Sequence, residues 1–361
     1  MLRSLLIPFW LGRVLTQEKS FERNPVIGNR WLNEHGLHAA RVRAANRLTR
    51  ARRNRLAKRL RPEDREGLDR DGFIIKRDFL PPHVFADLVV QVRGLRAAAR
   101  EMVEGDTITR RIALEPRVLD QLPAVRQLLL MPDYRNLIRY AGSSAAAPMV
   151  YLQTILSRSI EGPRDPQSAI HADTFHPTVK AWLYLNDTAS EAAPLIYVPG
   201  SHRLTPQRLE WERRMSLSAP NSPDADTRQG SFRIDPDDLN ALGLPQPRTL
   251  NEPANTLIVA DTFGFHARGR SSQPTTRVEI WAYGRRNPFL PWLGLDPWSI
   301  DALGLRKPII HWRLLDLIER AGLGRHRWRP SGEVSAFDPP AAQRTDALPA
   351  TASPTRLREA S

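Results

Sequence analysis

The chain has 361 residues, no cysteine and a formal net charge of +14, from 53 Lys and Arg against 39 Asp and Glu. A chain of this length can bury a substantial core, so a small disulfide-stapled protein is excluded. The lack of cysteine excludes disulfides, thiolate metal sites, iron–sulfur clusters and cysteine nucleophiles, and is expected of a cytoplasmic protein. No run of about 18 apolar residues occurs, so no membrane-spanning helix is predicted.

The positive charge is concentrated in residues 1–61. This segment contains 15 basic and 3 acidic side chains, a net of +12, which leaves +2 for the other 300 residues. The rest of the chain is therefore nearly neutral, and the basic character belongs to an N-terminal extension.

The extension, residues 1–61, is predicted to be basic, partly apolar and helical. Its apolar cluster Leu5-Leu6-Ile7-Pro8-Phe9-Trp10 is too short to span a bilayer but can lie in an interface. Residues 37–61 are compatible with a helix that has ten basic side chains and no acidic one, and Pro62 is expected to end it. Peripheral contact with an anionic membrane on its cytoplasmic face accounts for both features. A solvated helix face is the second interpretation, and a nucleic-acid arm is disfavoured because no aromatic interleaving or binding motif accompanies the charge.

Residues 62–300 are predicted to form a mainly β domain. A short strand and turn are expected in Asp69–Pro82, and helical spacing follows in 83–104 and 117–140. Short apolar runs separated by Pro, Gly, Asn and Asp, typical of a β-sandwich or barrel, then occupy 149–157, 179–186, 195–198, 256–260 and 278–284.

Three further segments complete the predicted organisation. The polar, Pro-rich insertion 205–250 is expected to act as a lid or substrate loop. Residues 301–330 are predicted to be a C-terminal helical segment. Residues 331–361 are rich in Pro, Ala and Ser without periodicity, so a disordered tail is predicted there.

Two histidines and one carboxylate are the candidate metal ligands. On a strand, His171 and Asp173 would point to the same face, although such a pair alone is explained as simply by a surface strand. His266 follows the apolar run 256–260, and two His with one carboxylate leave open positions on a metal, as in non-haem Fe(II) oxygenases. Arg277 begins the next strand, and a guanidinium there is a natural bidentate partner for a dicarboxylate.

Together with Asp71–Leu80 and Leu195-Ile-Tyr-Val-Pro-Gly-Ser-His202, these motifs resemble the phytanoyl-CoA dioxygenase-like (PhyH) family of Fe(II)/2-oxoglutarate-dependent oxygenases, over residues 65–287. The resemblance implies a double-stranded β-helix, which is a cupin-like jelly roll, with flanking helices. It also implies Fe(II), 2-oxoglutarate and O2, with iron ligands His171, Asp173 and His266. Arg277 would bind the distal carboxylate of 2-oxoglutarate, and the positions of Gln153 and Trp182 would line the same pocket.

The resemblance leaves the substrate and several side chains open. Arg268 stands where relatives often have a small polar residue, so it could bind co-substrate, face a phosphorylated substrate or be exposed. His176 is expected in a pocket wall, and Arg285 and Arg286 at a solvated strand end or beside an anionic substrate. The retained Asp173 implies hydroxylation of a C–H bond, in a small or lipid-like substrate, rather than halogenation. The alternative is a non-catalytic jelly-roll module that binds an anionic lipid or saccharide.

Overall fold

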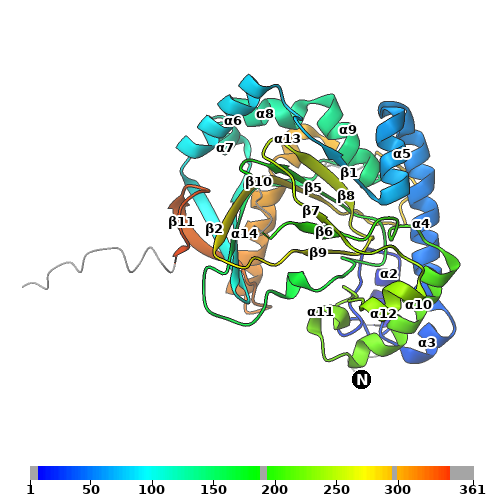
Figure 1. Ribbon diagram of the computed structural model, residues 1–361. Coiled ribbons are helices and arrows are strands. Elements are labelled where there is room, and N and C mark those ends of the chain that lie inside the picture. The colour runs from blue at the N-terminus through cyan, green and yellow to red at the C-terminus, as the bar shows by residue number, and fades with distance from the viewer. Residues whose placement is uncertain (1–6, 188–192, 295–298, 342–361) are drawn as a thin grey trace, which may run out of the picture.

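The computed structural model describes residues 7–187, 193–294 and 299–341 (Figure 1). Within these residues, an eight-stranded antiparallel sheet has the order β1 (Phe73–Lys76), β8 (Leu257–Asp261), β5 (Val179–Tyr184), β10 (Thr275–Gly284), β4 (Met149–Ser157), β3 (Thr107–Ala113), β2 (Ala97–Glu104) and β11 (Arg329–Val334). A smaller antiparallel sheet has the order β7 (Arg248–Leu250), β6 (Leu195–Tyr197) and β9 (His266–Arg268). The two sheets form the predicted jelly roll.

The long strands of the larger sheet send alternate residues to two different environments. On β10, Val278 and Ile280 join the main apolar core, whereas Arg277 and Trp281 line the cavity between the sheets. This follows from the period of two along a strand. One strand therefore contributes both to the core and to the wall of a cavity.

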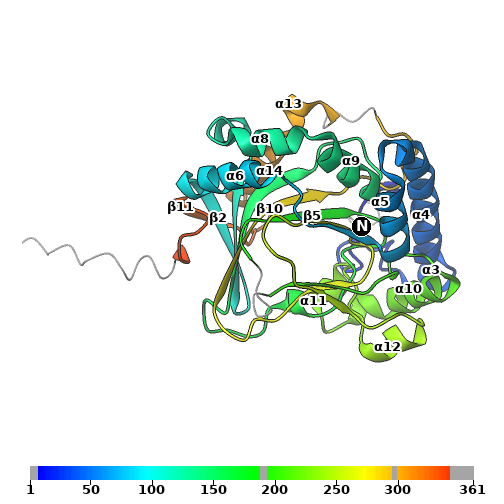
Figure 2. The same cartoon turned by 45° about the horizontal axis from the view of Figure 1, so that its top comes forward.

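Helices cover the outer face of the larger sheet, and others lie at one end of the domain (Figure 2). The covering helices are α6 (Pro82–Gly94), α7 (Pro116–Leu119), α8 (Pro123–Leu130) and α9 (Pro132–Ala141). The insertion 205–250 is folded into α10 (Pro206–Ser218), η3 (Ala219–Asn221), α11 (Ala225–Arg228), α12 (Pro236–Ala241) and β7. The remaining elements of the domain are α5 (Pro62–Asp71), η2 (Pro166–Ser168), α13 (Asp301–Gly304) and α14 (Lys307–Arg320).

The N-terminal extension packs against the domain rather than standing apart from it. It consists of α2 (Ile7–Val14), α3 (Arg30–Glu34), α4 (Leu37–Leu56) and η1 (Ala57–Arg59), and α4 contacts α9 and α10. Arg52 of α4 is buried and donates to the carbonyl oxygens of Ser143, Pro288 and Leu290. Leu5 and Leu6 of the predicted apolar cluster lie outside the described residues. No helix among the described residues is long and apolar enough to cross a membrane.

Two predictions about secondary structure are wrong. The helical spacing assigned to 83–104 ends at Gly94, and Ala97–Glu104 is strand β2, whose buried side chains alternate and whose backbone pairs with β3. The disordered tail predicted from Ser331 is wrong for residues 331–341, because β11 pairs with β2 and the buried Arg110 donates to the carbonyl oxygens of Ser335 and Asp338. Residues 342–361 of the predicted tail lie outside the described residues.

Candidate metal centre and substrate pocket

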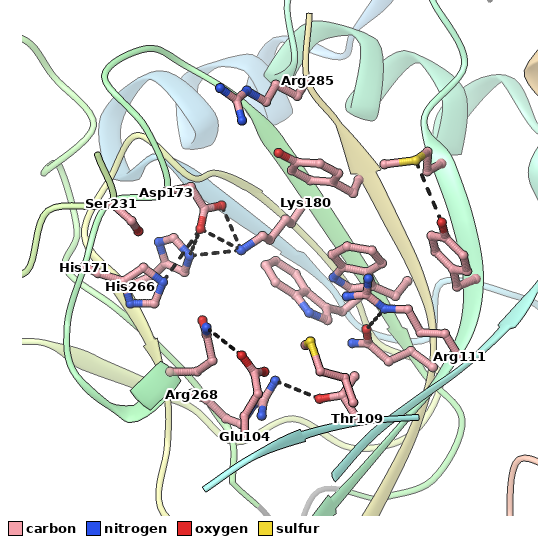
Figure 3. A pocket seen from close by; sticks show the side chains of 18 of the residues that line it. Glu104, Thr109, Arg111, His171, Asp173, Lys180, Ser231, His266, Arg268 and Arg285 are labelled. Atoms are coloured by element: carbon pink, nitrogen blue, oxygen red, sulfur yellow. Dashed lines mark hydrogen bonds and ion pairs between the residues drawn. The ribbon is translucent and has the colours of Figure 1, made fainter. Parts of the chain in front are cut away.

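A cavity of about 420 Å³ lies between the two sheets, and its lining is rich in charged side chains (Figure 3). Residues of β3, β4, β5 and β10 form one wall, and residues of β6 and β9 form the facing wall. Lys19 and residues of the segment 226–233 close one side of the cavity. The cavity contains every site residue that the sequence analysis named as a ligand or co-substrate contact: His171, Asp173, His266, Arg277, Gln153 and Trp182.

His171, Asp173 and His266 converge at one point of this cavity. The Nε2 atoms of His171 and His266 lie 3.7 Å and 3.5 Å from Asp173 Oδ1, and one ligand atom from each residue lies within 4.8 Å of the others. The backbone of His171 pairs with that of His266, which fixes the two imidazoles on adjacent segments. His171 forms isolated bridges to Arg233 and His266, and Asp173 lies in a bend, so the convergence does not require the regular strand that was predicted.

Both imidazoles are oriented by backbone carbonyls. Nδ1 of His171 donates to the carbonyl oxygen of Ala169 at 2.8 Å, and Nδ1 of His266 donates to that of Gly264 at 2.9 Å. A neutral imidazole with its proton on Nδ1 has its lone pair on Nε2, and in both residues Nε2 is the atom that faces the other ligands. Burial lowers the pKa of His171 to about 3, so this ring stays neutral and able to bind a metal.

Two lysines hold Asp173. Lys180 Nζ lies 2.9 Å from Oδ1 and 2.7 Å from Oδ2 of Asp173, and 3.4 Å from His266 Nε2. Lys19, from the N-terminal extension, donates to the backbone oxygen of Asp173 at 2.6 Å. Burial acts to raise the pKa of Asp173, but Lys180 and His266 outweigh it and hold this pKa well below its usual range. The carboxylate is therefore ionised, as a metal ligand must be.

A chain of four polar side chains connects Arg277 to Arg111 across strands β10, β4 and β3 of one wall. Arg277 Nε donates to Glu279 Oε2 at 2.9 Å, and Gln153 Nε2 donates to Glu279 Oε1 at 2.6 Å. Gln153 Oε1 in turn accepts a hydrogen bond from Arg111 Nε at 2.7 Å. Two arginines against one glutamate give this cluster a net charge of +1, so it can accept one further carboxylate without excess negative charge.

The other candidate residues from the sequence take different positions relative to the cavity. Arg268 lines the cavity and forms an ion pair with Asp165 at 2.7 Å, so it is not a free surface residue. Arg285 also lines the cavity and donates to the carbonyl oxygen of Gln17, whereas Arg286 donates to the backbone oxygen of Trp292. His176 is buried, with Nδ1 donating to the carbonyl oxygen of Pro177.

The sequence analysis did not identify Lys19, Lys180, Arg111 or Glu279 as site residues. Lys180 could have been found, since it is two residues from Trp182 on one strand and so shares its face. The same spacing relates Glu279 to Arg277. No local pattern relates Lys19 or Arg111 to the ligands.

Residues 68–230 match the family model of phytanoyl-CoA dioxygenase (PhyH). The resemblance to this family is confirmed. The matched segment contains His171 and Asp173 and ends before His266 and Arg277. Although His266 and Arg277 lie outside the matched segment, the structure places them in the same cavity as His171 and Asp173.

Solved structures of low sequence identity are also similar. The epimerase SnoN from nogalamycin biosynthesis is 19% identical, with 64% of this chain and 90% of that chain covered and a TM-score of 0.41. HygX from Streptomyces hygroscopicus, solved with nickel and 2-oxoglutarate, is 17% identical, with 62% and 87% covered and a TM-score of 0.37. AviO1 from Streptomyces viridochromogenes Tue57 is 20% identical, with 63% and 95% covered and a TM-score of 0.35. At these identities and scores, nothing about the activity of this chain follows from them. No curated protein matches the chain significantly.

Proposed function

We propose that the protein is an Fe(II)- and 2-oxoglutarate-dependent oxygenase that hydroxylates a C–H bond of an organic substrate. The observation that carries the proposal is the convergence of His171, Asp173 and His266, with both Nδ1 atoms already bonded to carbonyl oxygens. Two imidazoles and one carboxylate on one face of a metal are the donor set of non-haem iron oxygenases, and they leave other positions open. The donor set therefore fits Fe(II).

The polar cluster at Arg277 supports 2-oxoglutarate as the co-substrate. Arg277 is buried, lines the same cavity as the metal ligands and belongs to a cluster of net charge +1. Its guanidinium would bind the distal carboxylate, while Gln153 and Glu279 keep it in place. Trp182 would exclude water from the space between this carboxylate and the metal.

The iron and co-substrate would supply the oxidation: 2-oxoglutarate, O2 and the substrate C–H give succinate, CO2 and the corresponding alcohol. The chain itself orients the three ligands, keeps Asp173 ionised and separates the co-substrate carboxylate from solvent. Hydroxylation rather than halogenation is proposed because Asp173 supplies a carboxylate at the position that a halide would need to occupy.

The test is succinate formation from 2-oxoglutarate by Fe(II)-loaded protein in air. We expect succinate with the wild type and with His35→Gln, a change at an exposed histidine, and none with His171→Ala or Asp173→Ala. Arg277→Gln should raise the KM for 2-oxoglutarate at least tenfold, about the cost of a charge-assisted hydrogen bond, while metal affinity stays unchanged. Wild-type turnover in His171→Ala or Asp173→Ala would contradict the proposal. A wild-type protein that takes up neither Fe(II) nor 2-oxoglutarate would instead favour the non-catalytic binding module.

A further inference from the structure

A second group of cations lies on the side of the cavity that the N-terminal extension closes. Lys19 is close to Asp173, since its ammonium donates to the backbone oxygen of that residue. Arg285, at the end of β10, donates to the carbonyl oxygen of Gln17, two residues before Lys19. Both side chains line the cavity, and Figure 3 shows Arg285 on the same side of it as Asp173 and Lys180.

These two cations differ in their partners from three arginines elsewhere in the cavity wall. Arg233, Arg268 and Arg277 each form an ion pair, with Asp226, Asp165 and Glu279 respectively. Among the described residues, no ion pair joins Lys19 or Arg285 to a carboxylate, and Nε of Arg285 is buried without a hydrogen-bond partner. Two adjacent cations that face a cavity and have no carboxylate in direct contact are stabilised when an anion binds between them.

We propose that Lys19 and Arg285 bind an anionic group of the substrate, a phosphate or a carboxylate, beside the metal ligands. The proposal rests on the proposed function and adds a substrate class to it. It makes the N-terminal extension a wall of the active site. It also limits which C–H bond can be oxidised, because Lys19 is hydrogen-bonded to the residue that ligates the metal, so the reacting carbon lies close to the anionic group.

This position is distinct from the one proposed for 2-oxoglutarate. The co-substrate carboxylate belongs to the cluster of Arg277 and Arg111, which is linked through Gln153 and Glu279 and includes neither Lys19 nor Arg285. Loss of Lys19 or Arg285 should therefore weaken binding of the substrate anion, whereas loss of Arg277 should weaken binding of 2-oxoglutarate.

The test measures binding of inorganic phosphate to the full-length protein loaded with Mn(II), by calorimetry and against chloride at equal ionic strength. We expect saturable binding to the wild type, at least tenfold weaker binding to Lys19→Met and to Arg285→Met, and partial recovery in Lys19→Arg. Lys58→Met, which removes an exposed charge from η1, should bind phosphate as the wild type does. Affinities for Mn(II) and 2-oxoglutarate should be unchanged in Arg285→Met.

Wild-type phosphate affinity in both Lys19→Met and Arg285→Met would overturn the proposal, as would loss of 2-oxoglutarate binding in place of phosphate binding. If the wild type binds phosphate through Lys19 but takes up no metal or 2-oxoglutarate, the proposed function fails and the anion site remains. Vesicles of phosphatidylglycerol distinguish the source of the phosphate. Weaker vesicle binding in Lys19→Met identifies a lipid headgroup as the ligand, and unchanged vesicle binding identifies a small dissolved anion.

Discussion

Lys180 lies among the residues of the proposed metal site. Its ammonium contacts both carboxylate oxygens of Asp173 and lies 3.4 Å from His266 Nε2, among the atoms that would bind the metal. An ammonium and a divalent cation repel each other at such distances, because partial burial leaves their interaction poorly screened. Metal binding must therefore displace the ammonium from Asp173 or act against its charge.

Replacing Lys180 by Met should strengthen metal binding. The change removes this repulsion while it keeps an unbranched side chain of similar length, so we expect Lys180→Met to bind Mn(II) about tenfold more tightly than the wild type. Calorimetric titration of full-length protein with Mn(II) measures this, and Lys58→Met is the control for a lost surface charge. Unchanged or weaker Mn(II) affinity in Lys180→Met would show that the ammonium does not compete with the metal.

The sequence predicted the candidate ligands better than the side chains that hydrogen-bond to them. His171, Asp173, His266 and Arg277 were identified from motif, spacing and resemblance, and all four line one cavity. Lys19 could not be predicted, because only the packing of the extension brings it to a residue 154 positions away. Partners of this kind depend on tertiary contacts, for which a single sequence gives no local sign.

At the scale of elements, helix α4 has two basic faces with different roles. Arg41, Arg52 and Arg53 point inward: Arg41 donates to the carbonyl oxygens of Val14 and Glu18 in the extension itself, and Arg53 pairs with Asp261 of the domain. The other seven basic residues of 37–61 are exposed: Arg43, Arg47, Arg50, Arg55, Lys58, Arg59 and Arg61. The ten basic residues of 37–61 therefore divide into three that pack inward and seven that remain exposed at the surface.

Loss of one inward arginine should destabilise the fold. Arg52 is buried and donates to three carbonyl oxygens, so Arg52→Met removes the hydrogen bonds to Ser143, Pro288 and Leu290 and should lower the free energy of unfolding by about 3 kcal/mol. Arg50→Met, on the exposed face, should change it by less than about 0.5 kcal/mol. Urea denaturation measures both values, and equal effects of the two substitutions would contradict the assigned faces.

The exposed basic face of α4 is the surface through which the extension is predicted to contact an anionic membrane. Phe9 of α2 is 52% exposed, so an apolar element accompanies the exposed arginines. We expect full-length protein to co-sediment with phosphatidylglycerol vesicles but not with phosphatidylcholine vesicles, and the triple variant Arg43→Glu, Arg47→Glu, Arg50→Glu to lose this binding. Equal partitioning of wild type and triple variant would remove the membrane interpretation in favour of a solvated face.

The strands were predictable where an apolar run is covered on both faces, and less predictable where local spacing and strand pairing disagree. The apolar runs 149–157, 179–186 and 256–260 are strands β4, β5 and β8, because continuous apolar sequence fits a sheet covered on both faces. Ala97–Glu104 was assigned to a helix because residues 83–104 show helical spacing, and its Ala, Arg, Glu and Met residues also favour helices. Pairing with β3 and β11 overrides that preference, and such pairing depends on segments distant in sequence.

At the scale of the whole molecule, buried histidines make stability depend on pH. Burial, the largest cause in each case, lowers the pKa of His38, His171, His176 and His202 below the ordinary value of 6.5, to about 3 for His171 and His202. Between the folded and the unfolded pKa, the unfolded chain binds more protons than the folded chain. The free energy of unfolding should therefore fall as the pH falls below about 6.5.

This dependence is measurable on metal-free, full-length protein. Four histidines that are neutral when folded and charged when unfolded should reduce the free energy of unfolding by roughly a few kcal/mol between pH 7 and pH 5.5. Calorimetry at the two pH values should show a lower Tm and proton uptake on unfolding at pH 5.5. A Tm that is the same at both values would contradict the buried, neutral state of these rings.

The most direct test of the metal and co-substrate site is an absorption titration without oxygen. Fe(II) chelated by a 2-oxo acid has a visible charge-transfer band, so the band reports both groups bound together. We expect this band when 2-oxoglutarate is added to the anaerobic Fe(II)-loaded wild type, no band with Asp173→Ala, and a band that requires at least tenfold more 2-oxoglutarate with Arg277→Gln. A wild-type protein that binds Fe(II) but gives no band with 2-oxoglutarate, or an unchanged band in Asp173→Ala, would contradict the assignment of this cavity.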